Sequence, residues 1–343
     1  MSGERQLPRA RGIVPAAPER GGGAATPSYA PAEGAGSGLP GAPAPTTIGP
    51  RRFAWGTRTF VMGILNVTPD SFSGDGLLAS GAPEDRAPED RAPEHRASAA
   101  DRPIVAAALS RARRMVAEGA DLLDVGGESS RPGHAEVDAT EEARRVVPVI
   151  AALRAALPDV PLSIDTTKPS VAAAALDAGA NLVNDIWGVA ADDTLARFAG
   201  ERGVPLIVMH NRAEARYSNL LAEVLADLQR ALERAMAAGV AWENLVVDPG
   251  FGFGKAPAHN LALLRGLDAL RLLGRPVLLG TSRKSTLGKV LDLPPEERLE
   301  ATLATTALAV AAGVDIVRVH DVRANVRVAR MSDAVVRGEG GLR

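Results

Sequence analysis

The sequence contains no cysteine, and aromatic residues make up only 3% of its 343 residues. Without cysteine, the chain can form no disulfide bond, thiolate metal site or cysteine nucleophile. The scarcity of aromatic side chains disfavours surfaces that bind nucleic-acid bases by stacking. A reducing compartment is compatible with this composition, and we expect a cytoplasmic location.

The sequence also lacks an excess of charge of either sign and a long apolar run. Lys and Arg number 39 and Asp and Glu number 41, for a net charge of −2. A protein that binds nucleic acid or an anionic membrane would need a basic surplus. The longest charge-free apolar stretch near the C-terminus, residues 301–314, is too short to span a bilayer. We therefore expect neither a nucleic-acid partner nor a membrane partner.

Two segments have a low-complexity composition. Residues 1–52 are rich in Gly, Pro and Ala without a periodic apolar pattern, and we expect a disordered tail. Residues 82–96 repeat a pentapeptide three times, as Ala-Pro-Glu-Asp-Arg twice and then Ala-Pro-Glu-His-Arg. A proline in every fifth position prevents a stable helix, so we expect a loop insertion at about residues 81–100. The domain itself is expected to span residues 53–343.

Hydrophobic residues make up 46% of the whole chain. Outside the two low-complexity segments, the sequence alternates short β-type runs with longer amphipathic stretches. This alternation is typical of βα units around a parallel sheet. Eight such units predict a (β/α)8 TIM barrel, and a doubly wound open sheet is the alternative. The expected strands are residues 60–65, 122–126, 162–165, 182–186, 206–209, 245–248, 277–280 and 316–319. The expected helices are residues 104–118, 140–156, 170–178, 193–201, 220–238, 259–273, 299–312 and 322–336.

Polar residues follow each expected strand, and in a barrel these carboxyl ends meet at one mouth. The carboxylates there are Asp165 and Asp248, and the cationic side chains include Lys284, Arg318 and His320. Carboxylates can accept hydrogen bonds from adjacent N–H groups of a nitrogen heterocycle. Cations suit a phosphorylated anion. The pattern therefore indicates a site that holds a nitrogen heterocycle at depth and a phosphate ester near the rim.

Four long motifs lie in this region. The chain has Met62-Gly-Ile-Leu-Asn-Val-Thr-Pro-Asp-Ser-Phe-Ser73 and, later, Asp124-Val-Gly-Gly-Glu-Ser-Ser-Arg-Pro-Gly133. It also has Asp248-Pro-Gly-Phe-Gly-Phe-Gly-Lys255 and Gly280-Thr-Ser-Arg-Lys-Ser285. These motifs resemble those of the dihydropteroate synthase family, and the likeness extends over about residues 53–337. It implies a pterin-binding barrel that joins p-aminobenzoate to 6-hydroxymethyl-7,8-dihydropterin diphosphate in folate biosynthesis, with release of diphosphate and formation of 7,8-dihydropteroate.

The resemblance also implies a role for individual residues. The residues implied to hold the pterin are Asp165, Asn184, Asp248 and Lys284, with Met209 and Phe253 packed near its ring. The diphosphate would be held by Asn66, Arg318 and His320, with Mg2+ bound near Asn66. The p-aminobenzoate pocket would be shaped by Pro69, Phe72, Ser130 and Arg131, with Ser285 at the carboxylate of that substrate. The expected catalytic residues are Asp165, Lys284, Arg318 and His320, and a homodimer is the expected assembly.

The sequence departs from the family pattern at two positions. Ser130 stands where the family usually has Thr, which preserves the hydroxyl group. Asp75 lies one position later than the acid in the usual Ser-Asp-Gly-Gly of the first loop.

Simpler interpretations exist for several of these residues. Asp165 and Asp248 can also be explained as helix N-caps, and Asn184 as a turn residue. His210 is expected to orient the fifth loop, while Arg212 can be a solvated loop charge.

Three functions are compatible with the sequence: the synthase, a pterin-barrel methyltransferase acting on methyl-tetrahydrofolate, and a catalytically silent paralogue. The motif at residues 280–285 and the first two loops favour the synthase.

Overall fold

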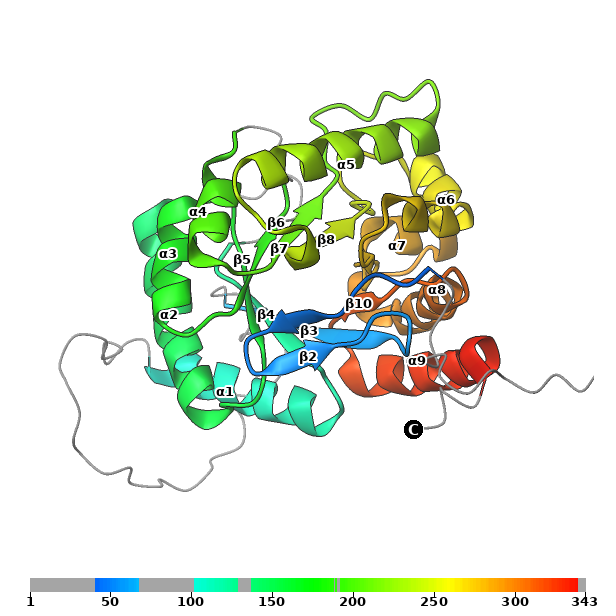
Figure 1. Ribbon diagram of the computed structural model, residues 1–343. Coiled ribbons are helices and arrows are strands. Elements are labelled where there is room, and N and C mark those ends of the chain that lie inside the picture. Colours follow the sequence, from blue (N-terminus) through cyan, green and yellow to red (C-terminus); the bar gives the residue numbers. More distant parts are fainter. Residues whose placement is uncertain (1–40, 68–101, 129–136, 188, 190–191, 339–343) are drawn as a thin grey trace, which may run out of the picture. The chain divides into compact units, whose positions relative to one another are not determined.

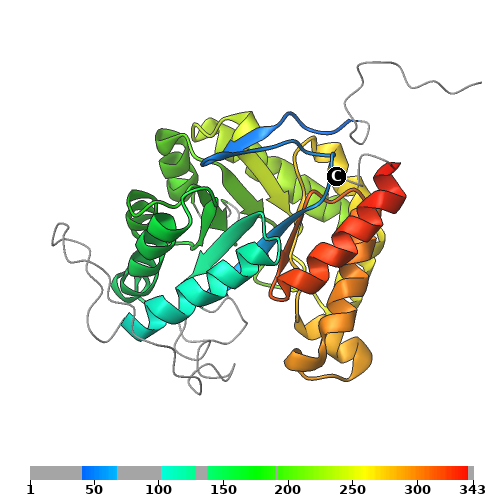
Figure 2. The ribbon, with the colours of Figure 1, turned by 90° about the horizontal axis from the view of Figure 1, so that it is seen from below.

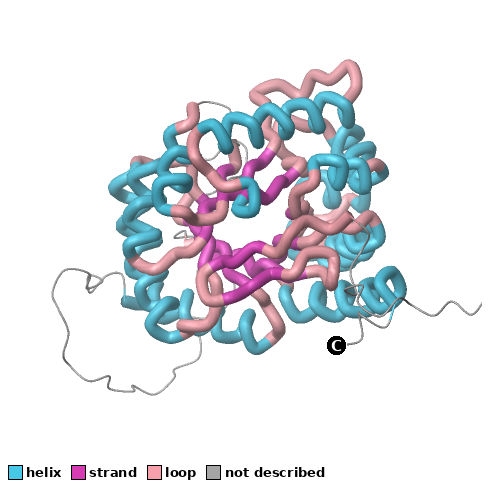
Figure 3. The backbone as a smooth tube through the Cα atoms, viewed as in Figure 1, coloured by secondary structure: helices cyan, strands magenta, loops and turns pink. Residues whose placement is uncertain are grey.

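The computed structural model describes residues 41–67, 102–128, 137–187, 189 and 192–338. Within these residues, a ring of parallel strands lies inside a ring of helices (Figures 1 and 3). The strands of the ring are β3 (Phe60–Asn66), β4 (Leu122–Gly126), β5 (Leu162–Asp165), β6 (Leu182–Asp185), β7 (Leu206–Met209), β8 (Leu245–Asp248), β9 (Leu278–Leu279) and β10 (Ile316–Val319).

The strands pair in the order β8-β7-β6-β5-β4-β3-β10-β9, and each neighbouring pair is parallel. A parallel bridge between Val247 and Val277 joins β8 to the residue before β9. The Val247 N–H also donates to the carbonyl of Pro276 over 2.9 Å. The ring is therefore nearly closed, and the expected (β/α)8 barrel is confirmed. The doubly wound sheet does not fit this strand order.

Helices follow the strands around the barrel and agree with the expected positions in most cases. They are α1 (Arg102–Ala117), α2 (Ala139–Ala156), α3 (Pro169–Asp177), α4 (Thr194–Arg202), α5 (Leu220–Ala237), α6 (Pro257–Arg265), α7 (Ser285–Leu291), α8 (Leu299–Ala311) and α9 (Val322–Arg337). Three 3-10 helices are η4 (Trp242–Asn244), η5 (Leu267–Leu273) and η6 (Pro295–Glu297).

One expectation about the helices was wrong, and one helix was not predicted. The single helix expected over residues 259–273 is α6 followed by η5, with Gly266 between them. A Cβ at Gly266 would lie 2.8 Å from Leu221, so the chain approaches α5 closely at this point. The seven-residue α7 was not expected, because so short a helix shows little apolar periodicity.

An antiparallel pair of short strands covers the amino ends of the barrel strands. It consists of β1 (Thr46–Ile48) and β2 (Arg51–Phe53), and it lies across one end of the barrel in both views (Figures 1 and 2). Ile48 and Phe53 are buried, and the Phe53 ring packs against Trp55 and Phe60 at centroid distances of 5.5 and 4.8 Å. The expected start of the domain at residue 53 is therefore too late, because apolar residues before it seal the barrel.

The barrel interior changes from apolar to polar along the strands. Side chains near the amino ends of the strands form one apolar cluster with Ile48, Phe53 and Trp55: Phe60, Met62, Leu122, Leu182, Ile207, Val246, Leu278 and Ile316. Side chains alternate along a strand, so the next inward position of β4 after Leu122 is Asp124. Hydrophobic burial thus closes one end, and polar groups gather at the other. No helix in the described part of the chain is long and apolar enough to cross a membrane.

Candidate active site

The carboxyl ends of the barrel strands bring six of the predicted site residues into one ring. Asn66, Asp165, Met209 and Asp248 are the last residues of β3, β5, β7 and β8, and the remaining strand residues are Asn184 on β6 and Arg318 on β10. The strand register aligns Asp165 with Asn184 and Met209 with Asp248. Asn184 is not a turn residue, because it lies within a strand. Asp165 is not a helix N-cap, because the N-cap position of α3 is occupied by Lys168.

Arg318 joins two carboxylates at the centre of this ring. Its Nη2 donates to Asp165 Oδ2 over 2.6 Å, and its Nε donates to Asp124 Oδ2 over 2.5 Å. Asn184 Nδ2 donates to the same Asp124 oxygen over 3.1 Å. Arg318 and Asn184 are therefore linked through Asp124, and Asp165 joins them through Arg318. Asp124 is the first residue of the motif at residues 124–133, but it was not predicted as a site residue. The alternation of β4 could have identified it as an inward-facing residue.

Burial and mutual charge set the ionisation of these groups. Burial raises the pKa of Asp165 to about 7, against the opposing effect of Arg318. Burial would lower the pKa of Arg318, yet Asp124 and Asp165 raise it above its usual value, so the guanidinium stays charged. One oxygen of Asp124, Oδ1, is buried without a hydrogen-bond partner. The ring thus contains acceptor capacity that no described protein group uses.

A second cluster surrounds the loop that follows β8, the sixth strand of the barrel, and that is called the sixth loop below. Asp248 Oδ1 accepts from the Gly250 N–H over 2.7 Å, a bond inside a turn, while α6 begins later at Pro257. Lys284 Nζ donates to the Phe251 carbonyl and lies 4.2 Å from the centroid of the Phe253 ring. Burial raises the pKa of Asp248 and lowers that of Lys284 to about 8. Phe253 and Lys284, predicted from distant motifs, are thus in contact.

Ser282 fixes the position of His320. The Ser282 Oγ accepts from the His320 N–H over 3.1 Å and lies 3.0 Å from the His320 Nδ1. Because Oγ accepts from the backbone, its own proton is available to Nδ1, which then leaves a hydrogen on Nε2. His320 can therefore present an Nε2–H donor to an anion. Ser282 was not predicted, although it belongs to the motif at residues 280–285.

Four of the predicted p-aminobenzoate residues lie outside the described residues: Pro69, Phe72, Ser130 and Arg131. The base of the second loop is described. Glu128 Oε1 accepts from the Val137 N–H over 3.4 Å, and Glu128 Oε2 accepts from Lys168 Nζ. Lys168 also donates to the buried Glu142 over 2.6 Å. Ser285, the fifth predicted residue of that pocket, is exposed at the first position of α7.

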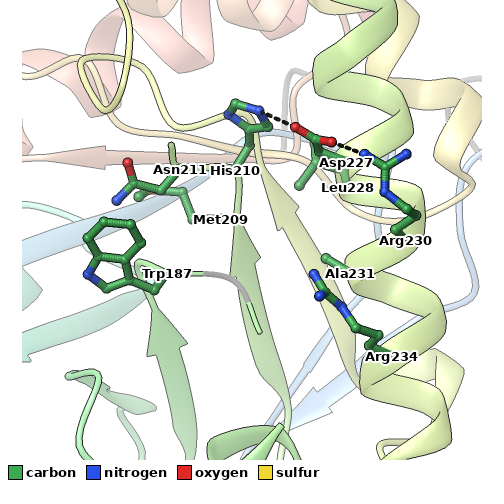
Figure 4. Close-up of a pocket in the computed structure, with 9 residues that line it drawn as sticks. All are labelled: Trp187, Met209, His210, Asn211, Asp227, Leu228, Arg230, Ala231 and Arg234. Atoms are coloured by element: carbon green, nitrogen blue, oxygen red, sulfur yellow. Dashed lines mark hydrogen bonds and ion pairs between the residues drawn. The ribbon is translucent and has the colours of Figure 1, made fainter. Parts of the chain in front are cut away.

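A hydrogen-bonded network lies beside this ring, at the end of β7. His210 Nε2 lies 3.1 Å from Asp227 Oδ2, and His210 Nδ1 lies 2.8 Å from Lys255 Nζ. Arg212 is paired with Glu223 over 2.7 Å and with Asp227 over 2.6 Å, so its interpretation as a solvated charge was wrong. A pocket of about 230 Å3 lies next to this network, between the end of β7 and α5 (Figure 4).

The residues around Asn66 offer few metal ligands of their own. No group of three or more His, Asp or Glu side chains in the described residues could hold a metal ion. A Cβ at Gly126 would lie 3.9 Å from Asn66 Oδ1 and 3.8 Å from Asp165 Oδ2, so both oxygens border the space over this glycine. Mg2+ often takes only one or two protein oxygens and completes its shell with water and phosphate oxygens. The Asn66 amide oxygen fits that pattern.

Comparisons with known proteins agree on one family. The family model of pterin binding enzymes matches residues 93–320. A dihydropteroate synthase of Clostridium beijerinckii is 44% identical over 84% of this chain and 99% of its own length. One of Bacillus subtilis is 45% identical over 85% of this chain and 94% of its own length.

Solved structures give the same result. A dihydropteroate synthase from Clostridium difficile, crystallised in the presence of pteroic acid, has a TM-score of 0.73 and 45% identity, covering 83% of this chain and 99% of that one. The enzyme of Xanthomonas albilineans in complex with 7,8-dihydropteroate has a TM-score of 0.71 and 37% identity, covering 85% of this chain and 98% of that one.

Proposed function

Since the chain belongs to the pterin-binding enzymes and, within them, to the dihydropteroate synthase family of transferases, we propose how its residues carry out the reaction of that family. The reaction condenses 6-hydroxymethyl-7,8-dihydropterin diphosphate with p-aminobenzoate in folate biosynthesis. The observation that carries the proposal is the ion pair between Arg318 and Asp165, which places a cation and an anion side by side at the barrel mouth.

The pterin binds to the polar ring in this proposal. Asp165, Asn184 and Asp248 supply oxygen acceptors for the N–H groups of the heterocycle, and Lys284 supplies a donor. The Phe253 ring packs against the Lys284 ammonium and offers an apolar contact to the pterin. Met209, on the neighbouring strand β7, adds a second apolar contact.

The chemical step breaks the bond between the pterin methylene carbon and the diphosphate oxygen, whose electron pair leaves with diphosphate. Positive charge develops on the pterin, and the Asp165 carboxylate opposes it. Arg318 and the Nε2–H of His320 hold the negative charge of the leaving group. The p-aminobenzoate nitrogen then donates its lone pair to the methylene carbon, and its proton passes to water. An aniline nitrogen is neutral at pH 7, so no protein base is needed.

We place Mg2+ at Asn66, whose amide oxygen would hold it together with diphosphate oxygens. Bound there, the ion would supply positive charge to the leaving group. Arg318 lies nearby through its bond to Asp165, so both positive charges would act on one side of the substrate. Removal of Mg2+ with a chelator would then raise the KM for the pterin diphosphate.

The p-aminobenzoate site is proposed from the motifs at the first two loops. Pro69, Phe72, Ser130 and Arg131 shape it, and Ser285 meets the carboxylate of the substrate. The described anchors of the second loop, Glu128 and Lys168, support a fixed base for this part of the site.

Measurement of the diphosphate that the purified protein releases from its substrate tests the proposed reaction. With the pterin diphosphate and p-aminobenzoate, we expect stoichiometric diphosphate and a product with the mass of 7,8-dihydropteroate. A pterin-barrel methyltransferase would instead consume methyl-tetrahydrofolate, and a silent paralogue would bind pterin without releasing diphosphate. Either of these two results would overturn the assignment.

We propose a homodimer, supported by exposed apolar side chains on adjacent helices. Leu308 on α8 and Met331 and Val335 on α9 are 56%, 66% and 73% exposed. Large exposed apolar groups are typical of surfaces that bind another protein. Light scattering of the wild-type protein and of Val335→Glu tests this assembly, which a monomeric wild type would exclude.

The domain limits and the location are also proposals. We propose a tail that ends near residue 40, a barrel from there to the C-terminus, and a loop insertion at about 81–100. We propose a cytoplasmic enzyme, because a highly charged diphosphate ester does not cross a bilayer unaided and must be used where it is made.

A further inference from the structure

The Lys255 ammonium group lies within the sixth loop. It bonds to that loop and to the fifth loop, which follows β7 and begins with His210. Its Nζ donates to the carbonyls of Gly250 and Phe253 over 3.1 and 3.0 Å. It also lies 2.8 Å from Nδ1 of His210 and 3.5 Å from the His210 carbonyl. Each of these partners is an acceptor, so the ammonium protons are directed to two separate segments of chain.

The two loops also approach each other so closely that only glycine fits. A Cβ at Gly250 would lie 1.8 Å from the His210 carbonyl oxygen, and one at Gly254 would lie 2.3 Å from the Arg212 carbonyl oxygen. Both glycines have positive φ angles, of 69° and 53°. The backbone of the sixth loop therefore lies directly on the fifth loop, with Lys255 joining the two.

His210 extends this arrangement to α5. Lys255 donates to Nδ1, so the ring hydrogen is on Nε2, which donates to Asp227 over 3.1 Å. Burial lowers the pKa of His210 to about 4, which keeps the ring neutral and able to accept at Nδ1. Asp227, drawn with His210 in Figure 4, thus fixes the ring orientation that Lys255 requires.

The opposite side of the sixth loop faces the polar ring of the candidate active site. Lys284 donates to the Phe251 carbonyl and covers the Phe253 ring, and a Cβ at Gly252 would lie 2.9 Å from Lys284. Between them, Lys255 and Lys284 therefore hold residues 250–253 of the loop. A shift of the loop would move Phe253 relative to Lys284 and Asp248.

We propose that Lys255, with its orientation supported by His210, is a positioning residue that sets the pterin-facing surface of the sixth loop. This inference rests on the proposed function of that surface. Lys255 contacts the back of the loop, so it acts through Phe253 and Lys284 and not on the reacting atoms. Its loss should weaken pterin binding and leave p-aminobenzoate binding nearly unchanged.

Lys255→Met removes the donors and retains the length of the side chain. We expect the affinity for 6-hydroxymethylpterin, measured by calorimetry, to fall at least tenfold, while the KM for p-aminobenzoate changes less than twofold. Lys289→Met, at an exposed lysine on α7, is the matched control. Amide hydrogen exchange of residues 250–255 should accelerate in Lys255→Met. That measurement requires no catalysis, so an inactive wild type would refute the proposed function without affecting this test.

Two substitutions of His210 separate its two hydrogen bonds and do not depend on the folding of Lys255→Met. His210→Asn retains an acceptor at the Nδ1 position, and His210→Gln retains a donor at the Nε2 position. We expect His210→Asn to bind the pterin more tightly than His210→Gln, which should resemble Lys255→Met. Equal affinities for the two His210 variants, or unchanged pterin affinity and loop exchange in folded Lys255→Met, would overturn the proposal.

Discussion

The guanidinium of Arg318 donates a hydrogen bond to the carboxylate of Asp165 over 2.6 Å, across the mouth of the barrel. The same guanidinium is held by Asp124 over 2.5 Å, so its position does not depend on Asp165 alone. Asp165 can therefore face the pterin while Arg318 faces the diphosphate. A displacement that begins with ionisation requires negative protein charge near the developing pterin cation and positive protein charge near the leaving diphosphate.

Asp165→Asn should slow the reaction more than it weakens substrate binding. The amide keeps the shape of the side chain but loses the negative charge opposite the developing pterin cation. We expect kcat to fall by roughly 10²-fold or more, with a smaller rise in KM. Steady-state kinetics would measure both, with Asp268→Asn, at an exposed position of η5, as a control. An effect on KM alone would show that Asp165 only binds the ring.

The pH dependence of kcat/KM for the pterin diphosphate should depend on the same carboxylate, because this ratio follows ionisation in the free enzyme. Burial raises the pKa of Asp165 to about 7, so lowering the pH through 7 protonates the carboxylate and removes the charge that favours ionisation of the substrate. We expect kcat/KM of the wild type to decline below about pH 7 and the decline to be absent in Asp165→Asn. The folded state binds this proton more tightly than the unfolded state, so its contribution to stability is present at low pH and is lost as the pH rises through 7. A flat kcat/KM profile between pH 6 and 8 would contradict the assignment.

Ser282→Ala should act through His320. Without the hydroxyl group, His320 Nδ1 loses its 3.0 Å partner, and the Nε2–H tautomer is no longer favoured. Loss of one oriented donor to the diphosphate should lower kcat/KM for the pterin substrate by roughly tenfold, which corresponds to about 1.4 kcal/mol. Ser282→Thr, which retains the hydroxyl, should restore most of the activity. Equal rates for Ser282→Ala and the wild type would remove Ser282 from this role.

The spacing of apolar residues along the sequence predicts much of the barrel, because each strand must bury an apolar face and each helix must bury an apolar stripe. The limits of β4, β5, β7, β8 and β10 agree with the expected ranges. The hairpin β1–β2 was missed because Ile48 and Phe53 are isolated apolar residues in a region rich in Gly and Pro. Their burial depends on residues far along the chain, which no local pattern reveals.

The site was predicted where strand ends and the family resemblance point to its residues, and it was incomplete where contacts alone define them. Asp165 and Arg318 were identified through their strand positions and the resemblance, and the structure joins them. Asp124 and Lys255 lie inside the quoted motifs, yet each contacts a residue on another element: Asn184 and Arg318 for Asp124, and His210 for Lys255. A buried carboxylate shared by Arg318 and Asn184 is a three-dimensional property that spacing along the chain does not specify.

Deletion of residues 82–97 should leave folding and pterin affinity nearly unchanged. The segment lies outside the described residues, and its composition of repeated Pro with mixed charge offers few apolar anchors. Shortening a loop changes the closure entropy only slightly, by about 0.6 kcal/mol per twofold change in length. We expect an unchanged melting temperature and at most a several-fold change in the KM for p-aminobenzoate. Loss of folding, or a hundredfold drop in kcat, would assign this segment to the site.

Truncation at two points should locate the start of the folded domain. Removal of residues 1–40 leaves the β1–β2 hairpin intact, so the melting temperature should stay within about 2 °C of the full chain, a shift of roughly 1 kcal/mol or less. Removal of residues 1–53 also takes away Ile48 and Phe53, which are 0% and 1% exposed, and the Thr46 hydroxyl that accepts from Trp55 over 2.9 Å. Burial of each large apolar side chain is worth about 1.5–3 kcal/mol, so this truncation should cost at least about 3 kcal/mol. Calorimetry or circular dichroism would measure the difference.

Ile48→Ala in the full chain, expected to cost roughly 2–5 kcal/mol, gives an independent measurement if the longer truncation aggregates. Equal melting temperatures for the two truncations would mean that the barrel closes its amino end without the hairpin.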